Sequence, residues 1–159
     1  MIIWEHRPRL VAHFLNPALM AVVIATSASD YERVREEAMP WMYAFIAAPL
    51  ILHGPTRRAL PRDTRTHLAT WVARNPTIVA GFPDRARGLV PCVREGLRYG
   101  LRSGVVVVTG QEVHSELSQP RGAVSGQLAE LIRAAGLIGR WVAKLDQPAT
   151  AYALLGVAP

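Results

Sequence analysis

The chain has 159 residues, of which 50% are apolar and 19% are charged, with a net charge of +6. This length favours one domain with one hydrophobic core. Disordered chains are polar and highly charged, so the composition excludes intrinsic disorder. The charged fraction lies below the roughly 25% of an ordinary soluble domain. It indicates that a partner covers part of the surface, although a small core rich in Ala and Val would give the same composition.

The N-terminal half is predicted to be helical between prolines. Asn16 as N-cap and Pro17 at the first helical position predict a helix start. The interior of this helix is apolar nearly all round and should therefore be buried on more than one side. Pro49 is expected to kink or end a later apolar helix. The predicted elements are an N-terminal arm at 1–15 and helices at 16–28, 31–38, 41–53 and 56–60.

The second half contains the predicted β-structure. A run of four valines, residues 105–108, favours a strand, and Thr109-Gly110-Gln111-Glu112 is typical of a turn. The predicted elements are helices at 65–74 and 83–102, strands at 105–108 and 113–115, and C-terminal helices within 125–155. We therefore predict a single domain over residues 1–159, mainly α with one β-hairpin. A winged helix-turn-helix-like core at 64–116 would carry extra N- and C-terminal helices.

The positive charge is concentrated in the middle third of the chain. Residues 57–102 contain ten Arg and three acidic residues, whereas residues 1–56 carry a net charge of −1 and residues 103–159 carry none. Such a concentration predicts a polyanionic partner, either nucleic acid or an acidic protein face. The alternative is a solvated arginine-rich surface, because Arg stems also cover apolar area.

Four arginines of the predicted helix 83–102 form a stripe when projected at about 100° per residue. They are Arg87, Arg94, Arg98 and Arg102. An apolar sector adjoins them, made of Val90, Val93, Leu97 and Leu101. A helix of this kind before a hairpin is typical of a groove-reading helix and wing, but any amphipathic surface helix has the same pattern, and Glu95 lies near the stripe. With Arg65 and Arg85, these arginines are the candidate residues for binding nucleic acid or an acidic partner.

No catalytic, cofactor or metal-binding pattern occurs in the sequence. The histidines lack the spacing of helical metal ligands, and Cys92 is the single cysteine. There is no Gly-rich phosphate loop and no nucleophile elbow. His53 is predicted to cap the preceding helix at its C-terminus, and Cys92 is predicted to be a buried structural residue. We expect no enzyme, no cofactor and no metal; a thiol enzyme using Cys92 is a distant third hypothesis.

The location expected from the sequence is cytoplasmic. One cysteine allows no internal disulfide. The longest apolar segment, residues 39–52, contains two prolines and is too short to span a bilayer. Residues 18–29 resemble a signal peptide only superficially, because Glu5 lies where a basic segment is needed.

Motifs along nearly the whole chain resemble those of one protein family. The longest is Pro-Leu-Ile-Leu-His-Gly-Pro-Thr-Arg-Arg-Ala-Leu-Pro at residues 49–61. The others are, in order, Asn16-Pro17-Ala18, Thr64-Arg65-Thr66, Trp71, Asn75-Pro76, Phe82-Pro83-Asp84-Arg85-Ala86, Leu89-Val90-Pro91, Arg94-Glu95, Gly139-Arg140-Trp141, Tyr152 and residues 156–159. Together they resemble the middle component of three-component ABC systems, such as Lamassu-type antiphage operons. Ala158 departs from the pattern, which has an aromatic or basic residue there.

The resemblance implies an adaptor without chemistry of its own. In such antiphage or anti-plasmid systems the middle component is encoded between an effector, commonly a nuclease, and an SMC/Rad50-like ATPase that senses foreign or abnormal DNA. The winged-helix-like core would then serve docking, and the basic patch would face double-stranded DNA held by the complex or an acidic surface of the ATPase. The alternative hypothesis, motivated by the arginine stripe, is a free-standing winged-helix transcription regulator that binds DNA.

Overall fold

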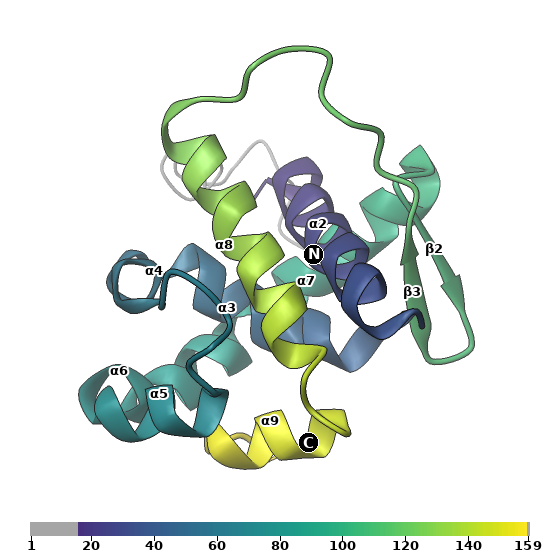
Figure 1. Ribbon diagram of the computed structural model, residues 1–159. Helices are drawn as coiled ribbons and strands as arrows, with labels where there is room; N and C mark the ends of the chain where they lie inside the picture. Colours follow the sequence, from purple (N-terminus) through teal and green to yellow (C-terminus); the bar gives the residue numbers. More distant parts are fainter. Residues whose placement is uncertain (1–15, 159) are drawn as a thin grey trace.

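The computed structural model describes residues 16–158, which form a mainly helical domain with one small antiparallel sheet (Figure 1). The expected arm at 1–15 lies outside the described residues. The elements are α2 (Pro17–Arg35), β1 (Met39–Pro40), η2 (Trp41–Tyr43), α3 (Ala44–Leu52), α4 (Gly54–Ala59), α5 (Leu68–Arg74), α6 (Pro76–Ala80), α7 (Phe82–Ser103), β2 (Val106–Thr109), β3 (Glu112–Ser115), α8 (Gly126–Val142) and α9 (Pro148–Leu154). The predicted class, mainly α with a β-hairpin, is confirmed. A likeness to winged-helix domains stays a prediction.

Helix α2 lies at the centre of the domain and packs against both α7 and α8. The Asn16 side chain accepts a hydrogen bond from the Ala18 N–H (2.8 Å), as expected of an N-cap. The two separate helices predicted at 16–28 and 31–38 are wrong, because α2 is continuous and ends at Glu36, whose φ is 59°. Contacts of its C-terminal half with α8 and β3 override the weak helix propensity of Thr26, Ser27 and Ser29. The expected burial on more than one side is confirmed.

A 3-10 turn replaces the start of the apolar helix predicted at 41–53, and a short strand that was not predicted precedes it. Strand β1 pairs with β3, with Met39 opposite Val113. Helix α3 follows η2 and continues through Pro49 instead of ending there. A strand of two residues has no alternating pattern that the sequence could reveal.

The three strands are antiparallel and have the order β1-β3-β2. The predicted hairpin is confirmed, with strand ends shifted by one residue. Thr109 pairs with Glu112, and Gly110 between them has a φ of 60°, a conformation that favours glycine in a tight turn. Val106 and Val113 are buried, and the sheet contacts α2 and α7 through this face.

The chain between α3 and α7 forms three short helices. The helix predicted at 65–74 begins only at Leu68. Helix α6 was not predicted, since Asn75-Pro76 indicates a helix end; proline at the first helical position also begins the next helix. Figure 1 shows α5 and α6 beside α9, and α5 contacts α9.

Two tryptophans join this segment to α8. The rings of Trp71 and Trp141 meet edge to face, with centroids 5.6 Å apart. The indole N–H of Trp71 donates to the Ala59 carbonyl (2.8 Å), and that of Trp141 donates to the Thr66 carbonyl (2.7 Å). Each buried indole therefore has its hydrogen-bond partner, as buried tryptophans require.

Helix α7 is one continuous helix of 22 residues that passes through Pro91. It packs closely on α2 and β2 through glycines. A Cβ on Gly96 would lie 2.3 Å from Met20 Cγ, and one on Gly100 would lie 2.8 Å from Val106 Cγ2. Gly104, with a φ of 72°, ends the helix before the hairpin. Among the described residues, no helix is both long and apolar enough to cross a membrane.

Candidate functional site

Helix α7 carries the four arginines of the predicted stripe on its solvent side. Arg87, Arg94, Arg98 and Arg102 are all exposed. The buried residues of this helix are Phe82, Ala86, Cys92, Val93, Gly96 and Gly100. In projection the stripe lies about half a turn from this buried side. Because α7 packs on α2 and α3 through the buried side, the arginines face outward.

The apolar sector next to the stripe is only partly buried. Val93 is fully buried, Val90 and Leu97 are half-buried, and Leu101 is 47% exposed. The side of the helix that contains Gly96 faces the core most directly, because the missing side chain allows the closest approach to α2. Val90, Leu97 and Leu101 lie at the edge of the buried side, and the glycines Gly96 and Gly100 lie near its centre.

An apolar hollow borders the N-terminal part of the stripe. It has a volume of about 440 Å³, and its lining includes Trp41, Phe45 and Val90 together with Arg87 and Arg94. The Trp41 side chain is 37% exposed, and its ring meets that of Phe45 edge to face at 5.7 Å. An apolar centre with a charged rim is the composition of protein–protein interfaces.

Two of the candidate arginines form exposed ion pairs. Arg87 lies 3.1 Å from Asp84, and Arg65 lies 3.3 Å from Asp63. Pairs this exposed contribute little to stability. Arg65 lies in the segment before α5, so it shares no element with the arginines of α7.

Arg85 has a structural environment that differs from that of the stripe. Its Nη2 donates to the Ile78 carbonyl (2.8 Å), and its guanidinium carbon lies 6.0 Å from the centre of the Phe82 ring. Its Nε is buried and has no hydrogen-bond partner among the described residues. Burial lowers the pKa of this guanidinium. Arg85 therefore ties α7 to the C-terminal end of α6.

His53 is the C-cap residue of α3, as predicted, but its side chain binds Thr56 instead of the open carbonyls of α3. Arg57 binds these carbonyls, because its Nη1 donates to those of Ile51 (2.7 Å) and Leu52 (3.1 Å). His53 instead caps the start of α4, where its Nδ1 accepts from the Thr56 N–H (3.4 Å). Burial, followed by the positive charges of nearby arginines, lowers the pKa of His53.

Cys92 is buried on α7, as predicted. Between residues 16 and 158, no group of three or more His, Cys, Asp and Glu side chains has an arrangement that could hold a metal ion.

A second basic surface is a groove that the sequence did not reveal. It has a volume of about 1030 Å³ and lies between α2, α4, α8 and the loop at 117–120. Among residues 16–158, six arginines line it: Arg33, Arg57, Arg58, Arg62, Arg133 and Arg140. The acidic residues of this part of the lining are Asp30 and Glu130. We call this surface the arginine groove.

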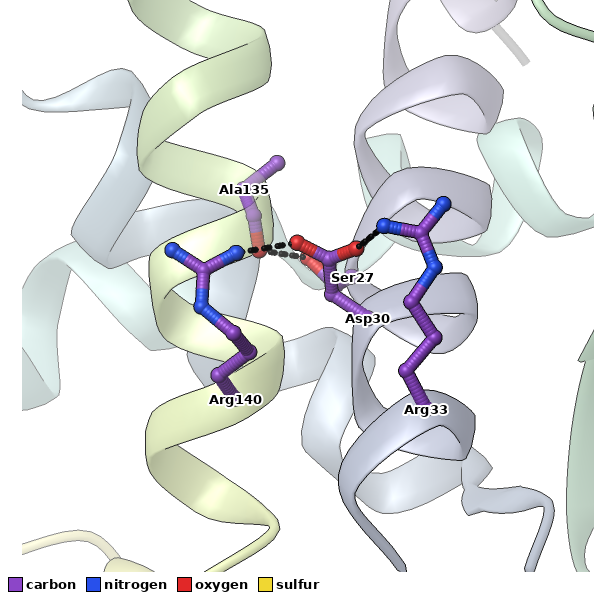
Figure 2. A network of polar contacts seen from close by, with 5 residues as sticks. All are labelled: Ser27, Asp30, Arg33, Ala135 and Arg140. Carbon is purple, nitrogen blue, oxygen red and sulfur yellow. Dashed lines mark hydrogen bonds and ion pairs between the residues drawn. The ribbon is translucent and has the colours of Figure 1, made fainter. Parts of the chain in front are cut away.

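A buried carboxylate holds two of these arginines (Figure 2). Asp30 on α2 is only 8% exposed. Its Oδ1 accepts from Arg33 Nη1 (2.9 Å) on the same helix, and its Oδ2 accepts from Arg140 Nη1 on α8. Gly136 leaves room for this carboxylate, since a Cβ there would lie 2.3 Å from Asp30 Oδ2. The network fixes the guanidinium groups at the contact between the two helices.

The sequence carries only a weak signal for the arginine groove. Its arginines span positions 33 to 140, and residues 103–159 have no net charge. The one local hint is Gly-Arg-Trp at 139–141, where an arginine stands among buried residues of an apolar helix face.

These features define a small helical domain with two basic surfaces, one on α7 beside an apolar hollow and one in a groove along α8. The family model for the ABC-three component (ABC-3C) system Middle Component 3 matches residues 4–159, and the chain belongs to this family. Searches among curated proteins and among solved structures found no match.

Proposed function

We propose that this chain is a non-catalytic adaptor that links an SMC/Rad50-like ATPase to an effector nuclease in a Lamassu-type defence system of the cytoplasm. Membership of the middle-component family over residues 4–159 carries the proposal. A middle component acts between two other subunits and so needs surfaces for both.

The surfaces of the domain support this role. The hollow between η2, α7 and α9 combines exposed Trp41 with Arg87 and Arg94. Aromatic and arginine side chains contribute the largest share of binding energy at protein interfaces. The arginine groove offers a second surface on other elements, α2, α4 and α8.

Co-purification tests the adaptor role. The full chain, tagged in its native host, is purified at moderate salt after nuclease treatment. We expect an ATPase of the SMC/Rad50 kind and one further subunit to remain bound, because protein contacts survive removal of DNA. A chain that emerges alone after nuclease treatment, yet is retained on DNA before it, contradicts the adaptor proposal.

The second candidate is a free-standing DNA-binding regulator with a winged-helix fold. It is favoured by the outward-facing stripe on α7, which leads directly into the β2–β3 hairpin. The order of α2, β1, α3, α7 and the hairpin, with β1 paired to β3, also suits a winged helix. Specific binding of the isolated full chain to one duplex sequence over others supports this candidate. Equal or absent binding to all duplexes removes it.

A further inference from the structure

The arginine groove contains more positive charge than the fold uses. Of the residues that the structure describes, six arginines and two acidic residues line it. Arg57 is engaged, since it binds the carbonyls at the end of α3. Arg58, Arg62 and Arg133 are exposed, and no hydrogen bond or ion pair joins their side chains to any residue within 16–158. Cations gathered in a concave surface raise the local concentration of anionic ligands.

Arg33 and Arg140 are fixed in position but keep binding capacity. Both share the carboxylate of Asp30 through one nitrogen each. A guanidinium group has five N–H donors in a rigid plane, so each arginine retains donors beyond those that Asp30 uses. Arginines already held in place lose less side-chain entropy when a ligand binds.

The rest of the lining shows which kind of anion fits. Apolar side chains lie among the arginines: Leu60, Pro61, Leu117, Pro120, Ile132 and Leu137. No aromatic side chain of residues 16–158 lines the groove, whereas sites for single-stranded nucleic acid use aromatic rings on which bases stack. The volume of about 1030 Å³ reaches the upper limit of small-molecule sites, about 1,000 Å³. A chain segment with alternating acidic and apolar side chains matches this lining.

We propose that the arginine groove is the docking site for an acidic, amphipathic segment of a protein partner. Its carboxylates bind Arg58, Arg62 and Arg133 at the exposed edges, and its apolar side chains contact Leu60, Ile132 and Leu137. This inference names the chemistry of one partner contact and therefore rests on the proposed adaptor function. It does not depend on the arginines of α7.

Fluorescence anisotropy with the full chain tests the docking site. The probe is a labelled peptide of about ten residues, which spans about 33 Å when extended. Every second residue of the peptide is Ser, and the remaining positions are occupied by Glu and Leu in turn. Two control peptides replace every Glu by Gln or every Leu by Ser. Oligothymidylate of the same length and a random-sequence duplex serve as nucleic-acid probes.

The double variant Arg58→Glu/Arg133→Glu is expected to weaken peptide binding at least about tenfold, since it reverses two charges at the interface. The matched variant Arg98→Glu/Arg102→Glu, with the same charge change on α7, should bind the peptide as the original chain does. Both control peptides should bind at least about tenfold more weakly than the probe, since charge and apolar contact both contribute. All substituted residues are exposed, and circular dichroism checks that each variant folds; Arg58→Glu alone replaces the double variant if that one does not fold.

Three results overturn the inference. The first is an equal loss of peptide binding in the groove variant and the α7 variant. The second is undiminished binding of the peptide without Leu. The third is binding of oligothymidylate or duplex that is tighter than peptide binding and depends on Arg58 and Arg133. Failure of the adaptor role is seen separately. In that case the peptide still binds through Arg58 and Arg133, but neither an ATPase nor an effector co-purifies with the chain.

Discussion

Gly139 on α8 lies directly against the backbone of Ser27 on α2, so close that a Cβ on Gly139 would stand 2.1 Å from the Ser27 carbonyl oxygen. Four residues earlier on α8, the Ala135 carbonyl accepts a hydrogen bond from the hydroxyl of the same serine, Ser27, at 3.0 Å. Figure 2 shows this hydrogen bond beside the Asp30 network, between the two helices. The absence of a side chain at Gly139 therefore sets the distance at which α2 and α8 cross.

Gly139→Ala is expected to destabilise the protein by about 3 kcal/mol, since the added methyl group meets backbone that cannot move aside. Urea unfolding followed by circular dichroism measures the change. Gly88→Ala on α7 is the matched control, because a Cβ there meets nothing within 4 Å. That control should stabilise the helix by about 0.5–1 kcal/mol. Equal effects of the two substitutions would show that the helix crossing is looser than described.

Asp30→Asn is expected to lower the free energy of unfolding by about 1 kcal/mol, because it removes the charge that two arginines share. The Arg140 side chain is 42% exposed and that of Arg33 is 63% exposed. In double-mutant cycles, Asp30→Asn should therefore couple more strongly to Arg140→Gln than to Arg33→Gln. Stronger coupling of Asp30 to Arg33 than to Arg140 would mean that the stabilising contact lies within α2 and not between α2 and α8.

His53 is expected to make stability depend on pH. Burial and the charges of Arg85, Arg57 and Arg58 lower the pKa of His53 in the folded chain, so the unfolded chain binds this proton more readily. Its contribution is thus complete above the ordinary histidine pKa of about 6.5 and is lost as the pH falls through the lower folded value. Protonation also removes the Nδ1 acceptor for the Thr56 N–H.

Unfolding midpoints in urea, measured between about pH 7.5 and about pH 5, test this dependence. His53→Asn is the control, since Asn can cap a helix start but does not titrate. The original chain should lose more stability on acidification than the variant. Parallel pH curves for the two proteins would mean that His53 does not produce the dependence.

The sequence predicted those parts of the fold whose signals are local. Helix α7 was found because its apolar and arginine residues recur at helical spacing, and the hairpin because four consecutive valines precede a Gly-containing turn. The buried state of Cys92 follows from residue type alone, because a lone cysteine is more often a buried structural residue than a reactive one.

Features that depend on distant residues were missed. Strand β1 exists because Met39 meets Val113 on β3, and α2 is continuous because its C-terminal half packs on α8. The arginine groove joins side chains from α2, α4 and α8, so no stretch of sequence contains it. Arg57 binds the carbonyls at the end of α3 and His53 caps the start of α4, and both contacts depend on how α3 and α4 meet.

Val90→Glu is expected to reduce capture of a partner subunit at least about tenfold while leaving the fold intact, because it places a carboxylate in the apolar hollow beside Trp41, where binding of the partner would have to remove its water. The matched control is Leu101→Glu, which makes the same kind of change on α7 at a residue that is 47% exposed and does not line the hollow. Quantitative co-purification of tagged variants, with circular dichroism to verify folding, provides the measurement. If both variants lose the partner equally, the interface follows the exposed length of α7 rather than the hollow. If neither does, the hollow takes no part in assembly and the contact with the partner must lie elsewhere on the domain.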